Sequence, residues 1–196
     1  MAVAERAEAT REALIVAARI LFVEKGYYNT GTEEIVAAAG VGTRGALYHH
    51  FADKRALFRA VFERVEHDLV GAAGKTKPAA DAYGRLRDGL LGFLDASLTP
   101  EVQRVLLIDG PAVLGWQDWR QLEEQYGLGS IQGLLDLAIA EGTIAAQPTG
   151  ALAHILLAAI DEAALYIANA KQPKKARDEA VQVVKRLLTG LVDKPA

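Results

Sequence analysis

Apolar residues recur every three or four positions near the start of the chain, which is the spacing of one helix face. The members of this face are Leu14, Ala17, Ala18, Leu21 and Phe22. Gly26 follows them as a typical stop, because glycine readily adopts the left-handed conformation that ends many helices. The pattern therefore predicts a first helix over about residues 8–25.

A short second helix is predicted to begin at Thr32, whose hydroxyl is a favourable N-cap. Glu33 and Glu34 occupy its first turn, where the helix dipole favours negative charge. The positions expected to face inward are Ile35, Ala38 and Ala39. Gly40 then forces a turn.

A third helix is predicted over residues 44–50, with Thr43 as its N-cap. Its local core is expected to consist of Val41, Leu47 and Phe51, because helices this short need tertiary packing to persist. Asp53 is expected to cap a fourth helix. That helix has apolar positions on one face at Leu57, Val61, Val65 and Leu69.

The remaining sequence predicts an all-α second part. A stretch of small residues at 71–77 before Pro78 predicts a break, so we place a domain boundary near residue 75, between parts 1–75 and 76–196. Further helices are predicted over residues 79–97, 100–107, 116–141, 150–170 and 173–192, with an interruption at Gly127 or Gly129 left open. The expected fold is a three-helix head followed by a larger helical bundle.

Composition excludes several classes of protein. The chain has no cysteine, which rules out a disulfide framework, a thiolate zinc site and a cysteine nucleophile. The first ten residues lack the basic start and apolar run of a signal peptide. His154, Asp161, Glu162 and Asn169 interrupt the most apolar stretch, which therefore predicts a buried helix rather than a membrane span. We expect a cytoplasmic protein without a membrane partner or a cofactor.

Charge is divided unevenly along the chain. The formal net charge is −3. Residues 1–75 hold ten basic and ten acidic side chains, so the whole deficit lies in the second part. Because phosphate neutralisation by Lys and Arg supplies most non-specific affinity for DNA, the net charge taken alone argues against a nucleic-acid partner, although the first part of the chain is neutral.

The two short helices joined at Gly40 have the plan of a helix-turn-helix, in which the second helix enters the major groove and both pack on a third. The pattern Thr10-Arg11-Glu12, Gly26-Tyr27, AAAGV at 37–41, GALYHHF at 45–51 and Asp53-Lys54 resembles the tetracycline-repressor (TetR) family over about residues 10–58. The resemblance implies a dimeric repressor that a small molecule releases from DNA.

The sequence departs from the usual pattern of the family at two places. Gly31 replaces a common Ser or Thr, and the turn at residues 42–44 has one extra residue, which leaves the register of the recognition helix open.

Matched residue by residue, the resemblance implies a set of DNA contacts. The groove-facing residues are Thr43, Arg44, Tyr48 and His49, and the phosphate contacts are Thr30, His50 and Lys54, with Tyr48 fitting either group. Arg44 is the candidate for direct base recognition, because a guanidinium can bond O6 and N7 of guanine together. The adjacent His49 and His50 point in different directions without a third ligand nearby, so no metal site is expected.

Aromatic and polar residues of the second part are candidates for an effector site. The predicted lining comprises Tyr83, Phe93, Trp116, Trp119, Tyr126, His154, Asp161 and Tyr166, which suits an apolar or aromatic small molecule. An ordinary helical core is the alternative for these aromatics. The last two helices are expected to form a homodimer interface, with apolar surface from Leu156, Ile160, Ala164, Val184 and Leu188 and with Asn169 in the seam.

Two other classes of protein compete with a one-component regulator. A helical-bundle enzyme would need a di-metal constellation with Glu-x-x-His repeats, and the chain contains no Glu-x-x-His. A helical protein-interaction module with an inactive helix-turn-helix is the second alternative. The sequence predicts a regulator of transcription that is not an enzyme.

Overall fold

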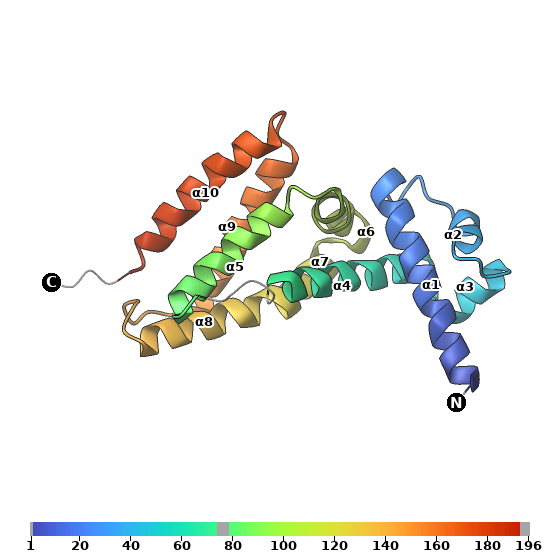
Figure 1. Cartoon of the computed structure of the whole chain (residues 1–196), viewed down its shortest axis with the longest axis horizontal. Helices are drawn as coiled ribbons and strands as arrows, with labels where there is room; N and C mark the ends of the chain where they lie inside the picture. Colours follow the sequence, from blue (N-terminus) through green and yellow to red (C-terminus); the bar gives the residue numbers. More distant parts are fainter. Residues whose placement is uncertain (1, 74–78, 193–196) are drawn as a thin grey trace. The chain divides into compact units, whose positions relative to one another are not determined.

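A computed structural model of the chain describes residues 2–73 and 79–192 (Figure 1). This part of the chain forms helices and one isolated β-bridge, between Ile144 and Val192, so the predicted all-α class is confirmed. The elements are α1 (Ala2–Lys25), α2 (Thr32–Ala38), α3 (Arg44–His50), α4 (Lys54–Ala73), α5 (Ala82–Ala96), η1 (Val102–Asp109), α6 (Gly110–Leu114), α7 (Trp116–Glu123), η2 (Glu124–Leu128), α8 (Gly129–Ala140), α9 (Thr149–Ala168) and α10 (Pro173–Thr189). The segments η1 and η2 are π-helical.

The described elements divide into two compact units. The first unit contains residues 1–66 and 104–119, and the second contains residues 67–103 and 120–196. The chain passes between the units three times, and each passage falls inside a helical segment: α4, η1 and α7. The predicted boundary near residue 75 lies outside the described residues. Of the predicted break at 71–77, residues 74–77 also lie outside them, whereas residues 71–73 continue α4.

The first unit packs α1 against α2 and α3 around an aromatic centre. Phe22 is fully buried, with its ring 5.4 Å from that of Phe58. The predicted inward residues of α1 are all buried, and so are Leu47 and Phe51. The prediction for α2 was partly wrong, because its buried pair is Ile35 and Val36, whereas Ala38 is exposed and Ala39 is half-buried.

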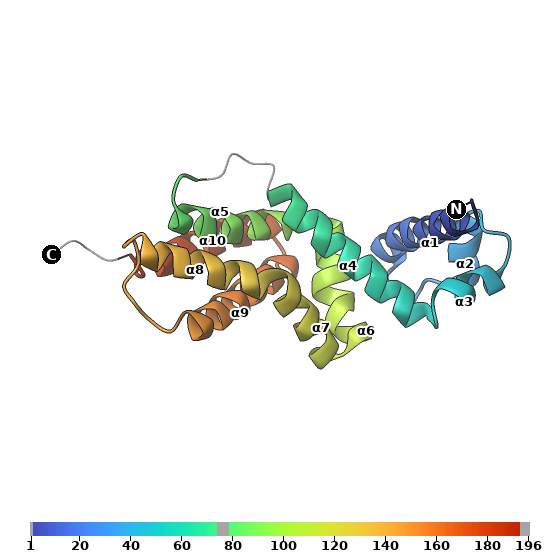
Figure 2. The same ribbon diagram turned by 90° about the horizontal axis from the view of Figure 1, so that it is seen from below.

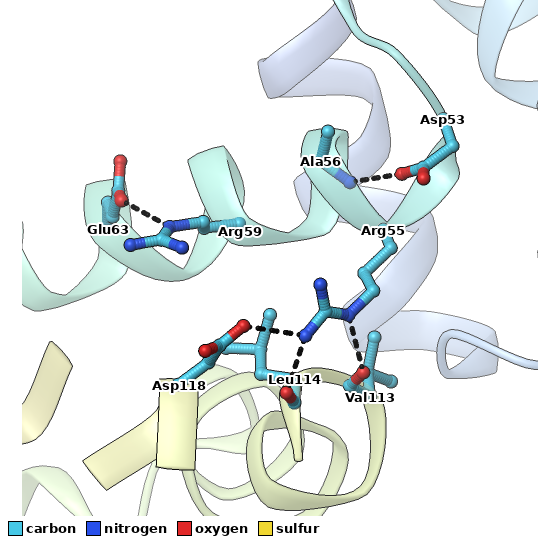
Figure 3. Close-up of polar contacts among 8 residues, drawn as sticks. All are labelled: Asp53, Arg55, Ala56, Arg59, Glu63, Val113, Leu114 and Asp118. Carbon is cyan, nitrogen blue, oxygen red and sulfur yellow. Dashed lines mark hydrogen bonds and ion pairs between the residues drawn. The ribbon is translucent and has the colours of Figure 1, made fainter. Parts of the chain in front are cut away.

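Two predicted N-caps are confirmed and a third is wrong. The Thr43 hydroxyl accepts a hydrogen bond from the Ala46 N–H at 3.4 Å, and the Asp53 carboxylate accepts one from the Ala56 N–H at 2.7 Å (Figure 3). Thr32 is the first helical residue of α2 and not its cap. The N-cap is Gly31, which has no side chain to offer. Because residue 31 is glycine and not the Ser or Thr that is common at this position, α2 has no side-chain cap.

The second unit is a bundle in which α5 contacts α8, α9 and α10, and α9 contacts α8 and α10 (Figures 1 and 2). The five residues predicted to supply dimer surface are buried in this bundle instead: Leu156, Ile160, Ala164, Val184 and Leu188. They are core residues because the other helices of the same chain cover them. The apolar side chains of α9 and α10 that stay exposed include Ile155, Tyr166, Val183 and Leu187.

The helices in the middle of the chain depart from simple α-geometry. The predicted helix 100–107 ended too early, because helical structure continues through η1 and α6 to Leu114 and stops at Gly115, where φ is 77°. The predicted interruption near Gly127 and Gly129 is confirmed as the π-helical η2. A Cβ at Gly127 would lie 3.2 Å from the Leu157 side chain, so glycine permits the close approach of α9.

Candidate nucleic-acid interface

Helix α3 presents a polar face to solvent and anchors an apolar face in the first unit. Leu47 is fully buried, whereas Arg44, Tyr48 and His49 are exposed and His50 is half-buried. The two histidine rings lie 5.2 Å apart, and the described residues contain no group of three side chains that could hold a metal ion. The rigid presentation of exposed polar side chains is what groove recognition requires of a short helix.

Arg44 is held by side chains of both α2 and α3. Its Nη1 lies 3.0 Å from Oε1 of Glu33, and its Nη2 donates to the Tyr48 hydroxyl oxygen at 3.5 Å. The guanidinium carbon also lies 5.9 Å from the centre of the Tyr48 ring. Hydrogen bonds from Arg44 and Thr32 to this hydroxyl lower the pKa of Tyr48. The guanidinium therefore has a defined orientation before DNA is bound.

Thr30 and Lys54, both expected to contact phosphate, face the protein instead. Thr30 is buried, and its hydroxyl donates to the Gly26 carbonyl oxygen at 2.8 Å. The Lys54 ammonium donates to the carbonyl oxygens of Tyr27 and Thr30 at 2.8 and 2.9 Å and lies 4.0 Å from the Tyr27 ring centre. Burial lowers the pKa of Lys54. In this structure Thr30 cannot reach a phosphate, because its only donor is used internally. Both residues hold the loop between α1 and α2.

A buried carboxylate links the loop between α1 and α2 to the segment 104–119 by a hydrogen bond. The sequence analysis did not identify this contact. Asp109 is buried and accepts hydrogen bonds from the Tyr27 N–H at 2.8 Å and from Nε of Arg104 at 3.1 Å. The Tyr28 hydroxyl donates to the Ala112 carbonyl oxygen at 3.2 Å. An acidic residue in the apolar run VLLID was the one available signal, since a buried carboxylate requires partners.

Arg55 makes a second tie, from the first turn of α4 to α6 and α7 (Figure 3). Its Nε donates to the Val113 carbonyl oxygen at 3.1 Å, and its Nη2 donates to the Leu114 carbonyl oxygen at 2.6 Å and to Asp118 at 2.7 Å. The last carbonyls of a helix have no partners within it, and a cation there also suits the negative end of the dipole. Arg55 therefore caps the C-terminal end of α6.

The structure does not bring the eight predicted effector residues together. Trp116 and Trp119 belong to the first unit, where their rings are 5.1 Å apart. Trp119 is buried, and its indole N–H donates to the Leu106 carbonyl oxygen at 3.2 Å, whereas Trp116 is exposed. The other six residues belong to the second unit.

The six candidates of the second unit differ in their surroundings. Tyr83, Phe93 and Tyr126 are half-buried. Tyr166 is exposed and donates from its hydroxyl to Glu179 at 3.2 Å. His154 is also exposed, and its Nδ1 lies 3.8 Å from Glu124.

Asp161, the sixth candidate, lies at the centre of a buried polar cluster. Its Oδ2 accepts a hydrogen bond from Nη1 of Arg120 at 2.9 Å, and the buried carboxyl of Glu123 is close enough to influence its pKa. Burial raises the pKa of Asp161 to about 6, against the opposing attraction of Arg120. The sequence analysis did not identify Arg120 and Glu123, because they approach Asp161 only in the folded bundle.

Both parts of the chain resemble known proteins. Residues 14–61 match the family described as bacterial regulatory proteins, tetR family, and residues 83–191 match the tetracyclin repressor-like C-terminal domain. The Transposon Tn10 TetC protein of Escherichia coli is 26% identical over 191 residues, which cover 97% of this chain and 96% of that protein. The HTH-type transcriptional regulator AcrR of Shigella flexneri is 35% identical over 105 residues, or 53% of this chain and 48% of that protein.

Solved structures resemble the whole chain. A TetR-family transcriptional regulator from Pectobacterium atrosepticum has a TM-score of 0.86 at 34% identity and covers 98% of both chains. RolR, crystallised in complex with resorcinol, has a TM-score of 0.72 at 17% identity, covering 98% of this chain and 100% of that one. At the latter identity the likeness concerns the fold.

Proposed function

Because the chain belongs to the TetR family of transcriptional regulators, we propose that it is a homodimeric repressor which binds a palindromic operator and is released by a small molecule. The observation that carries this proposal is the construction of α3. This helix is capped by Thr43, anchored by Leu47 and exposes Arg44, Tyr48 and His49. A short rigid helix of this kind fits the major groove.

In the proposed complex, each exposed side chain of α3 has its own role. The Arg44 guanidinium reads a guanine, because its fork of donors matches O6 and N7. Tyr48 and His49 contact base edges or the adjacent backbone, and His50 contacts phosphate. Lys54 and Thr30 act indirectly, because they fix the loop that leads into α2.

A homodimer through α9 and α10 suits the exposed apolar residues of these helices. The described part of the chain contains one helix that is long and apolar enough to cross a membrane, which is α9. Only 33% of its most apolar 18-residue stretch is buried within the chain. Ile155 and Tyr166 on α9 and Val183 and Leu187 on α10 supply apolar surface for a second copy. A twofold dimer presents two recognition helices to a palindromic site. We assign the protein to the cytoplasm, where its DNA target lies.

The effector site of this proposal lies in the second unit. Half-buried Tyr83, Phe93 and Tyr126 of this unit are its aromatic candidates, and Arg120 and Asp161 are its candidates for polar groups that fix orientation. The fold accommodates a small aromatic molecule in RolR. We propose an apolar or aromatic effector and no cofactor or catalytic role.

Release of DNA follows from the way in which the two units are linked. All three passages of the chain between the units fall inside helical segments, and a helix transmits a displacement along its length. An effector that prefers one arrangement of the units therefore changes the spacing of the two recognition helices. This requires a difference in affinity between the two states, and occupancy alone is not sufficient.

The proposed sign of regulation is repression. BepR of Brucella suis, 36% identical over 107 residues, is named a transcriptional repressor, and FasR of Mycolicibacterium smegmatis, 37% identical over 86 residues, is named an activator. Both matches cover about half of this chain, so the sign has to be measured directly. A reporter placed behind the selected operator should be silenced by this protein and induced by its effector.

Selection from a randomised pool of DNA duplexes tests the proposal. The wild-type protein should enrich a palindrome with half-sites roughly 34–36 Å apart, one turn of DNA or a multiple of it. Resorcinol and other small aromatic compounds are then titrated against the bound duplex. An effector should weaken DNA binding by the same factor by which DNA weakens effector binding. Enrichment of no sequence, with folding intact, would overturn the proposed function.

A further inference from the structure

An acidic side chain lies beside the proposed base-reading residue. Glu33 is in the first turn of α2, its side chain is 78% exposed, and its carboxylate pairs with Arg44 at 3.0 Å. The head carries as many acidic as basic residues, so it has no excess of positive charge to tolerate an acid near DNA. A carboxylate close to phosphates opposes binding to every sequence. Glu33 therefore weakens affinity in general unless it contributes to recognition in another way.

The first turn of α2 contacts the base-reading arginine of α3. Glu33 accepts a hydrogen bond from Nη1 of Arg44. Arg44 in turn donates from Nη2 to the Tyr48 hydroxyl and lies over the Tyr48 ring. The guanidinium is thus restrained from two sides, by a carboxylate of one helix and by a phenol of its own helix.

We propose that Glu33 is a positioning residue for operator recognition, which sets the direction of the Arg44 guanidinium and thereby the preference for one base pair. This inference rests on the proposed function. A free arginine on a helix surface has many rotamers, and most of them bring its charge to a phosphate rather than to a base edge. A guanidinium that is already oriented loses less freedom on binding and discriminates better between bases.

Glu34 provides a matched control. It is the next residue, it carries the same charge in the same turn of α2, and its side chain is 38% exposed, against 78% for Glu33. Its partner, however, is Lys25 of α1, and not a residue of α3. Glu34→Gln therefore removes the same charge without releasing Arg44.

The experiment compares Glu33→Gln, Glu34→Gln, Arg44→Ala and the double variant Glu33→Gln/Arg44→Ala. Each is bound to the palindromic duplex selected by the wild-type protein, to its single-base variants and to a duplex of unrelated sequence. We expect Glu33→Gln to strengthen binding to unrelated DNA and to reduce discrimination about three- to ten-fold at one base pair. That base pair should be the one at which Arg44→Ala also loses its preference. In the Arg44→Ala background, Glu33→Gln should change no base preference.

Four outcomes would overturn the inference. The first is unchanged discrimination in Glu33→Gln, and the second is an equal loss of discrimination at every base pair. The third is an equal effect of Glu34→Gln, and the fourth is a loss of discrimination that persists in the Arg44→Ala background. Thermal unfolding of each variant separates these effects from instability. If the wild-type protein selects no motif, the proposed function fails first, which is a result distinct from a motif that Glu33 does not influence.

Discussion

At the scale of single residues, the loop between α1 and α2 depends on interactions that converge from three directions. Thr30 bonds the Gly26 carbonyl oxygen from within the loop, Lys54 bonds two loop carbonyls from α4, and Asp109 receives the Tyr27 N–H from η1. Gly26 itself has φ of 80°, and a Cβ there would collide with the Arg104 guanidinium. Backbone groups without helical partners are costly to bury, so each of these contacts stabilises the entry to the helix-turn-helix.

Lys54→Met tests whether Lys54 supports the loop or contacts phosphate. Methionine keeps an apolar stem of similar length but removes the donors to Tyr27 and Thr30. We expect the free energy of unfolding to fall by about 1–3 kcal/mol, the range for hydrogen bonds from a charged donor. The slope of log K against log salt should stay unchanged, because no phosphate contact is lost.

Chemical unfolding and a salt titration of DNA binding measure the two quantities. Lys25→Met is the control, because Lys25 belongs to an exposed ion pair with Glu34 and such pairs contribute about 0–1 kcal/mol. If Lys54→Met left stability intact and lowered the salt slope by about one unit, Lys54 would be a phosphate contact as the sequence implied.

At the scale of helices, local chemistry was predictable from sequence and tertiary contacts were not. Thr43 and Asp53 were identified as caps because a cap depends on residues within one turn. The prediction of a cap at Thr32 was wrong, because the N-cap is Gly31, which has no side chain that could mark it as a cap in the sequence. Helix α6 was missed because Gly110 and Pro111 usually break a helix, whereas here Pro111 falls in its first turn, where a missing N–H costs little.

The candidate site likewise has features that the sequence predicted and features that it did not. The exposed face of α3 followed from helical periodicity, and its residues Arg44, Tyr48 and His49 are where the sequence placed them. The contact of Arg44 with Glu33 of α2 could not be predicted, nor could those of Lys54 with the loop between α1 and α2, because these groups meet only after packing. The pairing of Asp161 with Arg120 and Glu123 is of the same kind, with about forty residues of chain between the partners.

Asp161→Asn tests the tie between α7 and α9 through its pH dependence. The pKa of Asp161 is raised by burial from 3.8 to about 6, so the folded state retains a proton that the unfolded chain has lost. The contribution of this proton to stability is complete below pH 4, declines as the pH rises through 6 and is then absent. Two pKa units correspond to about 3 kcal/mol.

The measurement is the free energy of unfolding of wild-type protein and variant between pH 4 and pH 8. The difference between them should change with pH over that interval, with the wild-type protein losing stability relative to Asp161→Asn as the pH rises. Asp136→Asn, at an exposed position of α8, should follow the wild-type curve. Parallel curves for Asp161→Asn and wild type would contradict a raised pKa of Asp161 in the folded protein.

At the scale of the whole molecule, α9 links the bundle to the proposed dimer. Its sequence is apolar almost all round, so periodicity could not indicate which face is core and which is interface. The structure divides them: Leu156 and Ile160 face the bundle, whereas Ile155 stays exposed. Tyr166 of α9 donates to Glu179 of α10, so the exposed faces of the two helices are adjacent in one unit. One continuous apolar face is what an isologous interface requires.

Ile155→Glu and Leu187→Glu should each dissociate the dimer while the bundle stays folded. Both side chains are more than half exposed in the single chain, at 64% and 58%, so a glutamate there does not disturb the core. At a twofold interface each substitution buries two uncompensated charges. The cost is about 3–5 kcal/mol or more, which weakens the dimer at least about a hundred-fold.

Light scattering should give twice the chain mass of 21.0 kDa for the wild-type protein and the single mass for the variants. Operator binding should fall with dimerisation, because one recognition helix contacts only half of a palindrome. Leu137→Glu, at an exposed apolar position of α8, should remain dimeric and bind the operator. Dissociation by Leu137→Glu but not by Ile155→Glu would move the interface from α9 and α10 to α8.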